Sequence, residues 1–250
     1  MKTDPIYINT HDDHEKIASL FKKYDFISMP VVDNERRLVG IVTIDDVVDI
    51  IDQENTEDFQ KMAAIHPSDE EYLKTPPLVL ARHRITWLLI LMVSATFTGN
   101  IIIKFNEVLQ SVVVLASFIP MLMDTGGNSG SQSSTLIIRG LALGEIKTRD
   151  IFKVIWKELQ VSFIVGLVLS ALNFVRIHYL KKIDLNVTLT VCITLFFTVI
   201  LAKIIGCTLP ILAKKLKLDP AIMASPLITT IVDAAALTIY FSMATWILHI

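Results

Sequence analysis

The chain has 250 residues, 52% of them hydrophobic, and a formal net charge of −2 at pH 7. Its mean hydropathy of +0.56 is too high for an ordinary soluble domain and predicts that most of the chain lies in a lipid bilayer. Residues 1–80 carry 17 acidic and 8 basic side chains (net −9), whereas residues 81–250 carry 8 and 15 (net +7). We therefore expect an acidic soluble domain followed by a membrane domain with basic flanks.

Residues 1–51 predict a small α/β unit of order β-α-β-β-α. The expected strands are 6–8, 27–32 and 38–42, the first helix is 14–24, and Thr43 caps a second helix. Such a unit is small for an independent core, so we expect it to pair with another copy. No apolar core follows Lys2, so the N-terminus does not resemble a secretory signal and should be cytoplasmic.

Residues 52–80 predict a polar connecting helix, running from 52 to about 74, and a linker broken by prolines. The segment 45–58 is rich in carboxylates and holds no basic residue. Asp45, Asp49 and Asp52 share one helical face, as do Glu54 and Glu57 or Asp58. Like charges at this spacing destabilise a helix unless cations screen them. The segment predicts either a divalent-cation sensor or a solvated acidic face.

Residues 81–250 predict an α-helical membrane domain with five transmembrane helices. The expected spans are 85–103, 108–138, 159–175, 185–212 and 221–248. An odd number of crossings and a cytoplasmic N-terminus place the lysine-rich loops 139–158 and 214–220 inside, as the positive-inside rule requires. The loop 176–184 would be outside although it contains Arg176, Lys181 and Lys182. We expect a multi-pass protein of the cell membrane.

Asp233 is the most informative residue of the fifth span, because His249 is the only other ionisable side chain between 221 and 250. Intramembrane acids cost roughly 2.5–3.5 kcal/mol on insertion scales, and they usually face a bundle interior or a water-filled path. A cation site is the first interpretation. A protonated or hydrogen-bonded structural carboxylate is the alternative.

The second span contains a polar, glycine-rich segment at residues 124–134. Its glycines favour either a broken helix or close helix packing. Asp124, Asn128, Ser131 and Thr135 together favour a hydrated pathway, because polar groups at membrane depth must be buried in protein or line a wet cavity. Oxygen ligands without thiolate or imidazole suit a hard cation such as Mg²⁺ or Ca²⁺. Lys203, in the fourth span, is expected to snorkel or to pair with an acid.

Three segments resemble a known family. Residues 120–135, residues 218–227 and Asp233 resemble the membrane domain of the MgtE-type magnesium channels, and residues 38–46 resemble part of a CBS unit. The resemblance implies a homodimer with a pore between the subunits, lined by the second and fifth helices. It implies that Asp233 holds hydrated Mg²⁺ beside the Thr229 carbonyl, that Asp219 is a ligand at the cytoplasmic mouth, and that Ser225 lines the path.

The same resemblance gives roles to the soluble part. The helix after Asp52 is similar to the family's plug helix, and cytosolic Mg²⁺ would close the gate through Asp46, Asp49, Glu54, Glu57 and Asp58. Phe26, Thr43 and Asp45 match positions that contact ATP or another adenine nucleotide in CBS domains. Family members usually have an acidic N-terminal domain and two CBS units. The chain begins at what resembles the second CBS unit, which implies impaired closure.

Three functional hypotheses follow. The first is a magnesium channel, the second is an ion-coupled cation carrier using Asp233 and Asp124 alternately, and the third is a non-conducting nucleotide or Mg²⁺ sensor. Coupling of flux to Na⁺ or H⁺ would distinguish the carrier. No nucleophile, base and oxyanion set is visible in the sequence, so an enzyme is not expected, and no nucleic-acid partner is predicted.

Overall fold

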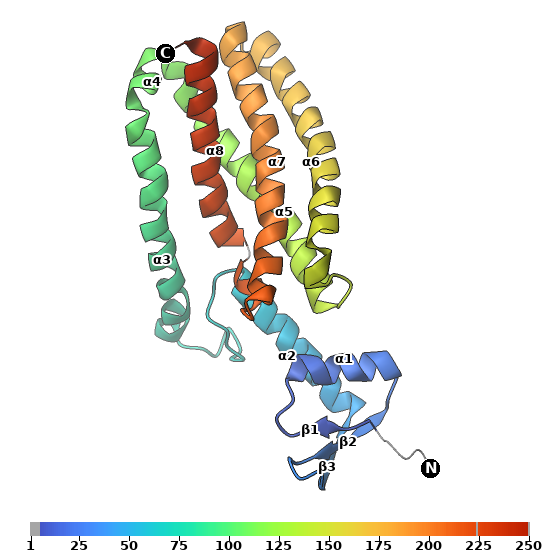
Figure 1. Ribbon diagram of the computed structural model, residues 1–250. Helices are drawn as coiled ribbons and strands as arrows, with labels where there is room; N and C mark the ends of the chain where they lie inside the picture. Colours follow the sequence, from blue (N-terminus) through green and yellow to red (C-terminus); the bar gives the residue numbers. More distant parts are fainter. Residues whose placement is uncertain (1–5, 224, 250) are drawn as a thin grey trace. The chain divides into compact units, whose positions relative to one another are not determined.

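Figure 1 shows the computed structural model of the chain, which describes residues 6–223 and 225–249. The chain divides into two compact units. The first comprises residues 1–60 and 67–75, and the second comprises residues 61–66 and 76–250.

The first unit has the predicted β-α-β-β-α order. Strand β1 (Ile8–Asn9) pairs in parallel with β2 (Ser28–Val32), which pairs antiparallel with β3 (Leu38–Thr43). Helix α1 (His14–Tyr24) and helix α2 (Ile44–Met62) supply apolar side chains to one core. The buried members of that core are Ile8, Ile17, Ala18, Phe21, Met29 and Val47.

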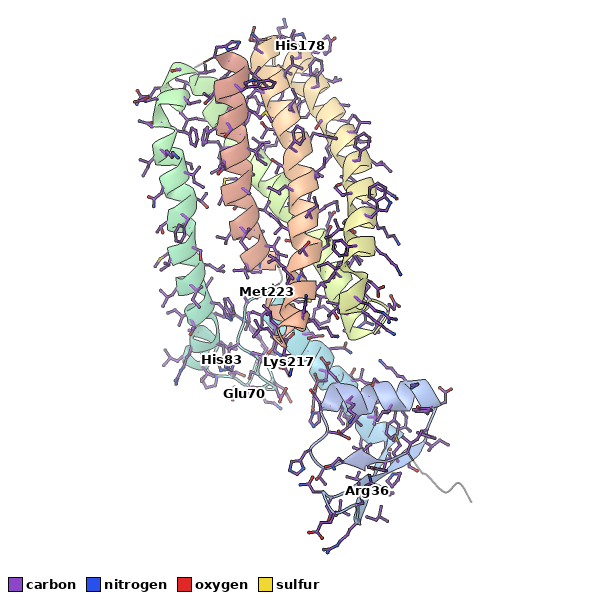
Figure 2. The ribbon with its side chains drawn as sticks, in the orientation of Figure 1. Arg36, Glu70, His83, His178, Lys217 and Met223 are labelled. Atoms are coloured by element: carbon purple, nitrogen blue, oxygen red, sulfur yellow. The ribbon has the colours of Figure 1, made fainter. Side chains whose placement is uncertain are left out.

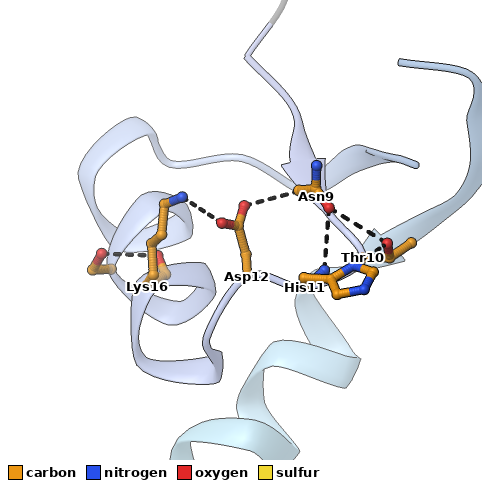
Figure 3. Close-up of polar contacts among 6 residues, drawn as sticks. Asn9, Thr10, His11, Asp12 and Lys16 are labelled. Carbon is orange, nitrogen blue, oxygen red and sulfur yellow. Dashed lines mark hydrogen bonds and ion pairs between the residues drawn. The ribbon is translucent and has the colours of Figure 1, made fainter. Parts of the chain in front are cut away.

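Asp12 ties the first strand to the first helix (Figure 3). Its carboxylate accepts hydrogen bonds from the backbone N–H of Asn9 at 2.9 Å and from Lys16 Nζ at 2.5 Å. The Asn9 side chain in turn accepts from the backbone N–H of His11 at 3.2 Å. The Lys16 hydrogen bond, followed by that of Asn9, holds the pKa of Asp12 below its usual range.

Helix α2 differs from its sequence-based prediction. It is one helix of 19 residues that continues through position 52, and it ends at Met62 rather than near residue 74. Ala64 adopts a positive φ of 55°, which a right-handed helix does not accommodate, and Pro67 follows it. Residues 63–76 therefore form a non-helical linker.

The second unit contains five long helices, as predicted, joined by short helical turns. The long helices are α3 (Pro77–Lys104), α5 (Ile119–Ala142), α6 (Ile151–Phe174), α7 (Leu185–Lys215) and α8 (Ser225–Leu248). Among residues 6–223 and 225–249, four stretches are long and apolar enough to cross a membrane, and α5 is not one of them. Its polar and glycine residues lower its hydropathy although its length is sufficient.

The predicted second span, 108–138, was wrong at its start. Residues before Ile119 form a short helix α4 (Asn106–Ser111) and a 3-10 helix η1 (Val113–Phe118), and only then does α5 begin. Leu115 and Phe118 are buried in the core at this end of the unit, and the Tyr240 hydroxyl donates to the Leu115 carbonyl at 2.9 Å. This apolar packing makes residues 106–118 a turn rather than part of a span.

Helix α7 is the centre of the second unit. It packs against α5, α6 and α8, while α3 lies against α8 at the side of the bundle (Figure 1). Figure 2 places His178 at one end of this unit and Lys217, Met223 and His83 at the other. The remaining connections are 3-10 helices η2 (Thr148–Asp150) and η4 (Pro220–Met223) and a π-helical turn η3 (Val175–Leu180).

Candidate cation pathway

One face of α5 packs closely because it has no side chains. A Cβ atom at Gly130 would lie 2.7 Å from Ile228 Cγ2, and one at Gly127 would lie 2.9 Å from Thr229 Cγ2, both on α8. Neither glycine breaks the helix, which is continuous from Ile119 to Ala142. Of the two sequence-based interpretations of these glycines, the broken helix was wrong and close packing is correct.

A second face of α5 is polar and largely exposed. Asp124, Asn128 and Thr135 are exposed, and Ser131 is half-buried. The four residues follow helical spacing, and Asn128 Nδ2 donates to Asp124 Oδ1 at 3.1 Å. Packing of the glycine face therefore fixes the rotation of α5 so that these four side chains point away from α7.

Asp233 lies beside this polar face. It is half-buried on α8, close enough to Asp124 for the two carboxylates to repel each other. Thr229 stands one turn earlier, with its hydroxyl donating to the Pro226 carbonyl at 2.9 Å. Among residues 6–223 and 225–249, no three His, Cys, Asp or Glu side chains are grouped to hold a metal. A single chain thus supplies two acids toward a cation, and no complete coordination cage.

Serines join α5 to the start of α8. Ser131 Oγ and Ser225 Oγ are 2.9 Å apart, and Ser134 donates to the Met223 carbonyl at 3.0 Å. The structure thus brings Ser131 and Ser225, both expected to line the path, into direct contact.

A buried ion pair lies where α5, α6 and α7 meet. Lys203 Nζ of α7 is 3.9 Å from Glu158 Oε2 of α6, and both side chains are almost fully buried. Ser133 of α5 lies between them, donating to Glu158 at 2.6 Å and accepting from Lys203 at 3.3 Å. Lys203 therefore pairs with an acid, one of the two roles expected for it.

Sequence reasoning missed the partner, Glu158, because it assigned this residue to the loop 139–158. Helix α6 begins at Ile151, so Glu158 lies two turns inside it. Lys153 and Lys157 are exposed on these same turns, and their charge suggested a loop. The sequence did contain a signal for a helix that starts earlier. Glu158 is the one acid between 151 and 183, and the residues around Lys153 and Lys157 are mostly apolar.

Asp219, predicted at the mouth of the path, already has a cationic partner. Its Oδ2 is 2.5 Å from Lys61 Nζ, while its Oδ1 accepts from the backbone N–H of Ala221 at 2.8 Å. Next to this pair, Met62 packs on Ile138 and Ala221. A divalent cation at Asp219 would have to compete with the Lys61 ammonium group.

The acidic residues of α2 fall into two groups. Asp45, Asp46 and Asp49 are exposed, whereas Glu54, Glu57 and Asp58 are half-buried. Burial, followed by repulsion from Glu57, Glu15 and Asp13, raises the pKa of Glu54. His14 Nδ1 lies 3.8 Å from Glu54 Oε1. This concentration of negative charge would be relieved by a bound cation.

Asp46 also serves as a helix cap. Its Oδ2 accepts from the Thr43 hydroxyl at 2.6 Å and from the Thr43 backbone N–H at 3.1 Å, which is half of a capping box. These hydrogen bonds hold the pKa of Asp46 below its usual range. Phe26 stacks on Tyr24, with ring centroids 5.5 Å apart, and packs against the core. Phe26 and Thr43 thus have internal partners, and Asp45 is exposed to solvent.

Comparison with known proteins decides the family. A family model described as MgtE, divalent cation transporter, matches residues 119–243, which includes α5, Asp124 and Asp233. The chain belongs to the MgtE family. A CBS domain model matches residues 1–53, where the predicted α/β unit is observed. The MgtE family is one of transporters rather than enzymes, which agrees with the expectation from the sequence.

Relatives named as MgtE magnesium transporters match along the chain. That of Thermus thermophilus is 40% identical over 251 residues, covering 100% of this chain and 55% of its own length. That of Bacillus subtilis is 37% identical over 249 residues, covering 100% and 54%. That of Enterococcus faecalis is 30% identical over 239 residues, covering 96% and 52%. The chain spans about half the length of the curated MgtE relatives that it matches.

Proposed function

We propose that this chain forms a homodimeric channel that passes hydrated Mg²⁺ across the cell membrane, down its electrochemical gradient. The observation that carries this proposal is the open polar face of α5 at membrane depth, formed by Asp124, Asn128, Ser131 and Thr135. An unpaired carboxylate facing hydrocarbon would cost roughly 2.5–3.5 kcal/mol. A second copy that covers this face encloses a wet path and removes the cost.

Asp233 is the proposed ion site within that path. One chain offers Asp233 and Asp124, which repel each other, and two copies related by a two-fold axis would double this negative charge. Mg²⁺ retains several waters when few carboxylates hold it, so a site of this kind suits a hydrated ion. The Thr229 carbonyl and Ser225 would contact its water shell, and Asp219 would attract the ion at the mouth.

Gating is assigned to α2. In this proposal cytosolic Mg²⁺ binds Asp46, Asp49, Glu54, Glu57 and Asp58 and closes the path, and the N-terminus is cytoplasmic. Burial and neighbouring acids raise the pKa of Glu54, and a bound cation would relieve the repulsion among these carboxylates. An adenine nucleotide such as ATP would bind the CBS unit through Phe26, Thr43 and Asp45.

The experiment that tests the proposal is Mg²⁺ flux into liposomes containing the purified chain. We expect flux that follows the membrane potential and needs no Na⁺ or H⁺ gradient. The relatives are named magnesium transporters, which supports the choice of ion. Flux that requires a Na⁺ or H⁺ gradient would replace the channel by a carrier. Nucleotide binding without any cation flux would replace it by a sensor.

A further inference from the structure

A cavity outside the proposed cation path lies where α6 ends. It has a volume of about 230 Å³ and is lined on its polar side by Thr125, Asn173 and Arg176. Met121, Leu169 and Leu172 are among its apolar lining residues. One water molecule occupies ~30 Å³ of volume in the liquid, so a single bound water would not fill this cavity. The cavity therefore has room for a group larger than one water molecule.

Asn173 provides a buried donor without an acceptor. Its side chain is 7% exposed, and its Oδ1 accepts from Arg176 Nη2 at 2.7 Å, which fixes the direction of the amide. Its Nδ2 then has no hydrogen-bond partner among the described residues. An unsatisfied buried donor costs about 1–3 kcal/mol, so it calls for an explanation.

Arg176 adds a positive charge beside this donor. Its Nη2 contacts Asn173 Oδ1 and, at 2.9 Å, Met121 Sδ, and no carboxylate pairs with it within residues 6–223 and 225–249. The rest of its five-donor guanidinium remains available. Arg176 belongs to the π-helical turn η3, a local widening of the helix that occurs frequently at functional sites.

We propose that this cavity binds the phosphate group of an anionic phospholipid. The available groups of Asn173 and Arg176 are all donors, and the lining has no acid, so an anion with several acceptor oxygens matches it. The apolar wall favours a lipid over a free ion, because Leu172 is 65% exposed where an acyl chain would lie. His178, two residues after Arg176, lies at the end of the bundle, where lipid headgroups are expected (Figure 2).

This proposal also accounts for the basic residues that the positive-inside rule did not explain. Arg176, Lys181 and Lys182 lie in or directly after η3, at the end of the bundle assigned to the outside. Basic side chains placed to meet anionic headgroups are independent of the rule that sets orientation. The site does not rest on cation conduction and stands even if the chain conducts nothing.

The test is thermal melting of the full chain in detergent with added lipid. Phosphatidylglycerol is expected to raise Tm by several degrees, and phosphatidylcholine is expected to raise it much less. Arg176→Gln should weaken the phosphatidylglycerol response about tenfold in lipid concentration, whereas Lys157→Gln, at an exposed position of α6 outside the cavity lining, should leave it unchanged. An equal response in native chain and Arg176→Gln would overturn the proposal.

Two further arms complete the test. Inorganic phosphate that stabilises the chain as strongly as the lipid, in an Arg176-dependent way, would overturn the lipid as the ligand. If Arg176→Gln does not fold, Asn173→Leu replaces it, because leucine removes the unsatisfied donor at similar volume. We expect Asn173→Leu to be folded and to lose the lipid response, and a retained response would contradict the site.

Discussion

Gly206 of α7 packs directly against the backbone carbonyl oxygen of Gly130 of α5. A Cβ atom at Gly206 would lie 2.2 Å from that oxygen, a distance that no side-chain adjustment can relieve. This contact holds the glycine face of α5 against α7 and leaves the face with Asp124 and Asn128 open. The position of the proposed cation path therefore depends on a residue outside it.

Gly206→Ala should destabilise the membrane unit. The added methyl group meets backbone, so the helices must separate, and overpacking of this kind costs about 1–3 kcal/mol. Melting in detergent measures the loss. Gly99→Ala on α3 is the matched control, because a Cβ atom there meets nothing within 4 Å, and it should be neutral or slightly stabilising. Equal melting temperatures for the two variants would contradict the packing account.

Lys203→Met should lower the stability of the fold more than the loss of both charges does. The single change leaves Glu158 buried without its cation, which typically costs about 3–5 kcal/mol. Lys203→Met combined with Glu158→Gln removes both charges, and Gln can still accept from Ser133, so the double variant should recover much of the lost stability. Melting temperatures of the two variants are compared. A double variant less stable than Lys203→Met would contradict an ion pair.

Glu54→Gln should stabilise the CBS unit near pH 7. Burial and the neighbouring acids raise the pKa of Glu54 above its usual value of 4.5, so the folded state disfavours the charged form. The unit is thus expected to lose stability as pH rises from 4.5 through this raised pKa, and Gln removes that loss. Amide hydrogen exchange in α1 and α2 of the full chain measures it. Identical pH dependence in both proteins would refute the assignment.

Lys61→Met should increase Mg²⁺ entry in the proposed channel. Lys61 neutralises Asp219 at the mouth of the path, and its removal restores a negative charge that attracts cations. Flux at low Mg²⁺ should rise about two- to tenfold. Asp219→Asn provides the control, since Lys61→Met should add nothing in its presence. An equal increase with and without Asp219 would place the effect of Lys61 elsewhere.

The sequence predicted the elements better than their contacts. Alternation and turn residues correctly predicted the β-α-β-β-α unit, and the apolar run 185–212 correctly predicted the position of α7. Both results depend on local sequence patterns. The proposed roles of Asp233 and of the acids on α2 remain predictions, because they depend on a cation and a second copy.

What the sequence could not predict depends on contacts between distant segments. The glycines of α5 were compatible with a break or with close packing, and Gly206, 76 residues after Gly130, decided the question. The partner of Lys203 could be identified only if the start of α6 was placed correctly. The lysines near that start led to Glu158 being assigned to a loop. The length of α2 was misjudged because its polar second half lacks an apolar stripe, so periodicity gave no clear end.

The central claim is tested most directly by Mg²⁺ flux through Asp233→Asn and Asp233→Ala in liposomes, measured beside the unchanged chain at equal reconstituted amounts. Asn keeps the size and the polarity of the side chain and removes the charge. The account predicts that both variants lose most of their flux or their preference for Mg²⁺ while they melt at a temperature close to that of the unchanged chain. Normal flux and normal selectivity in both variants would contradict it.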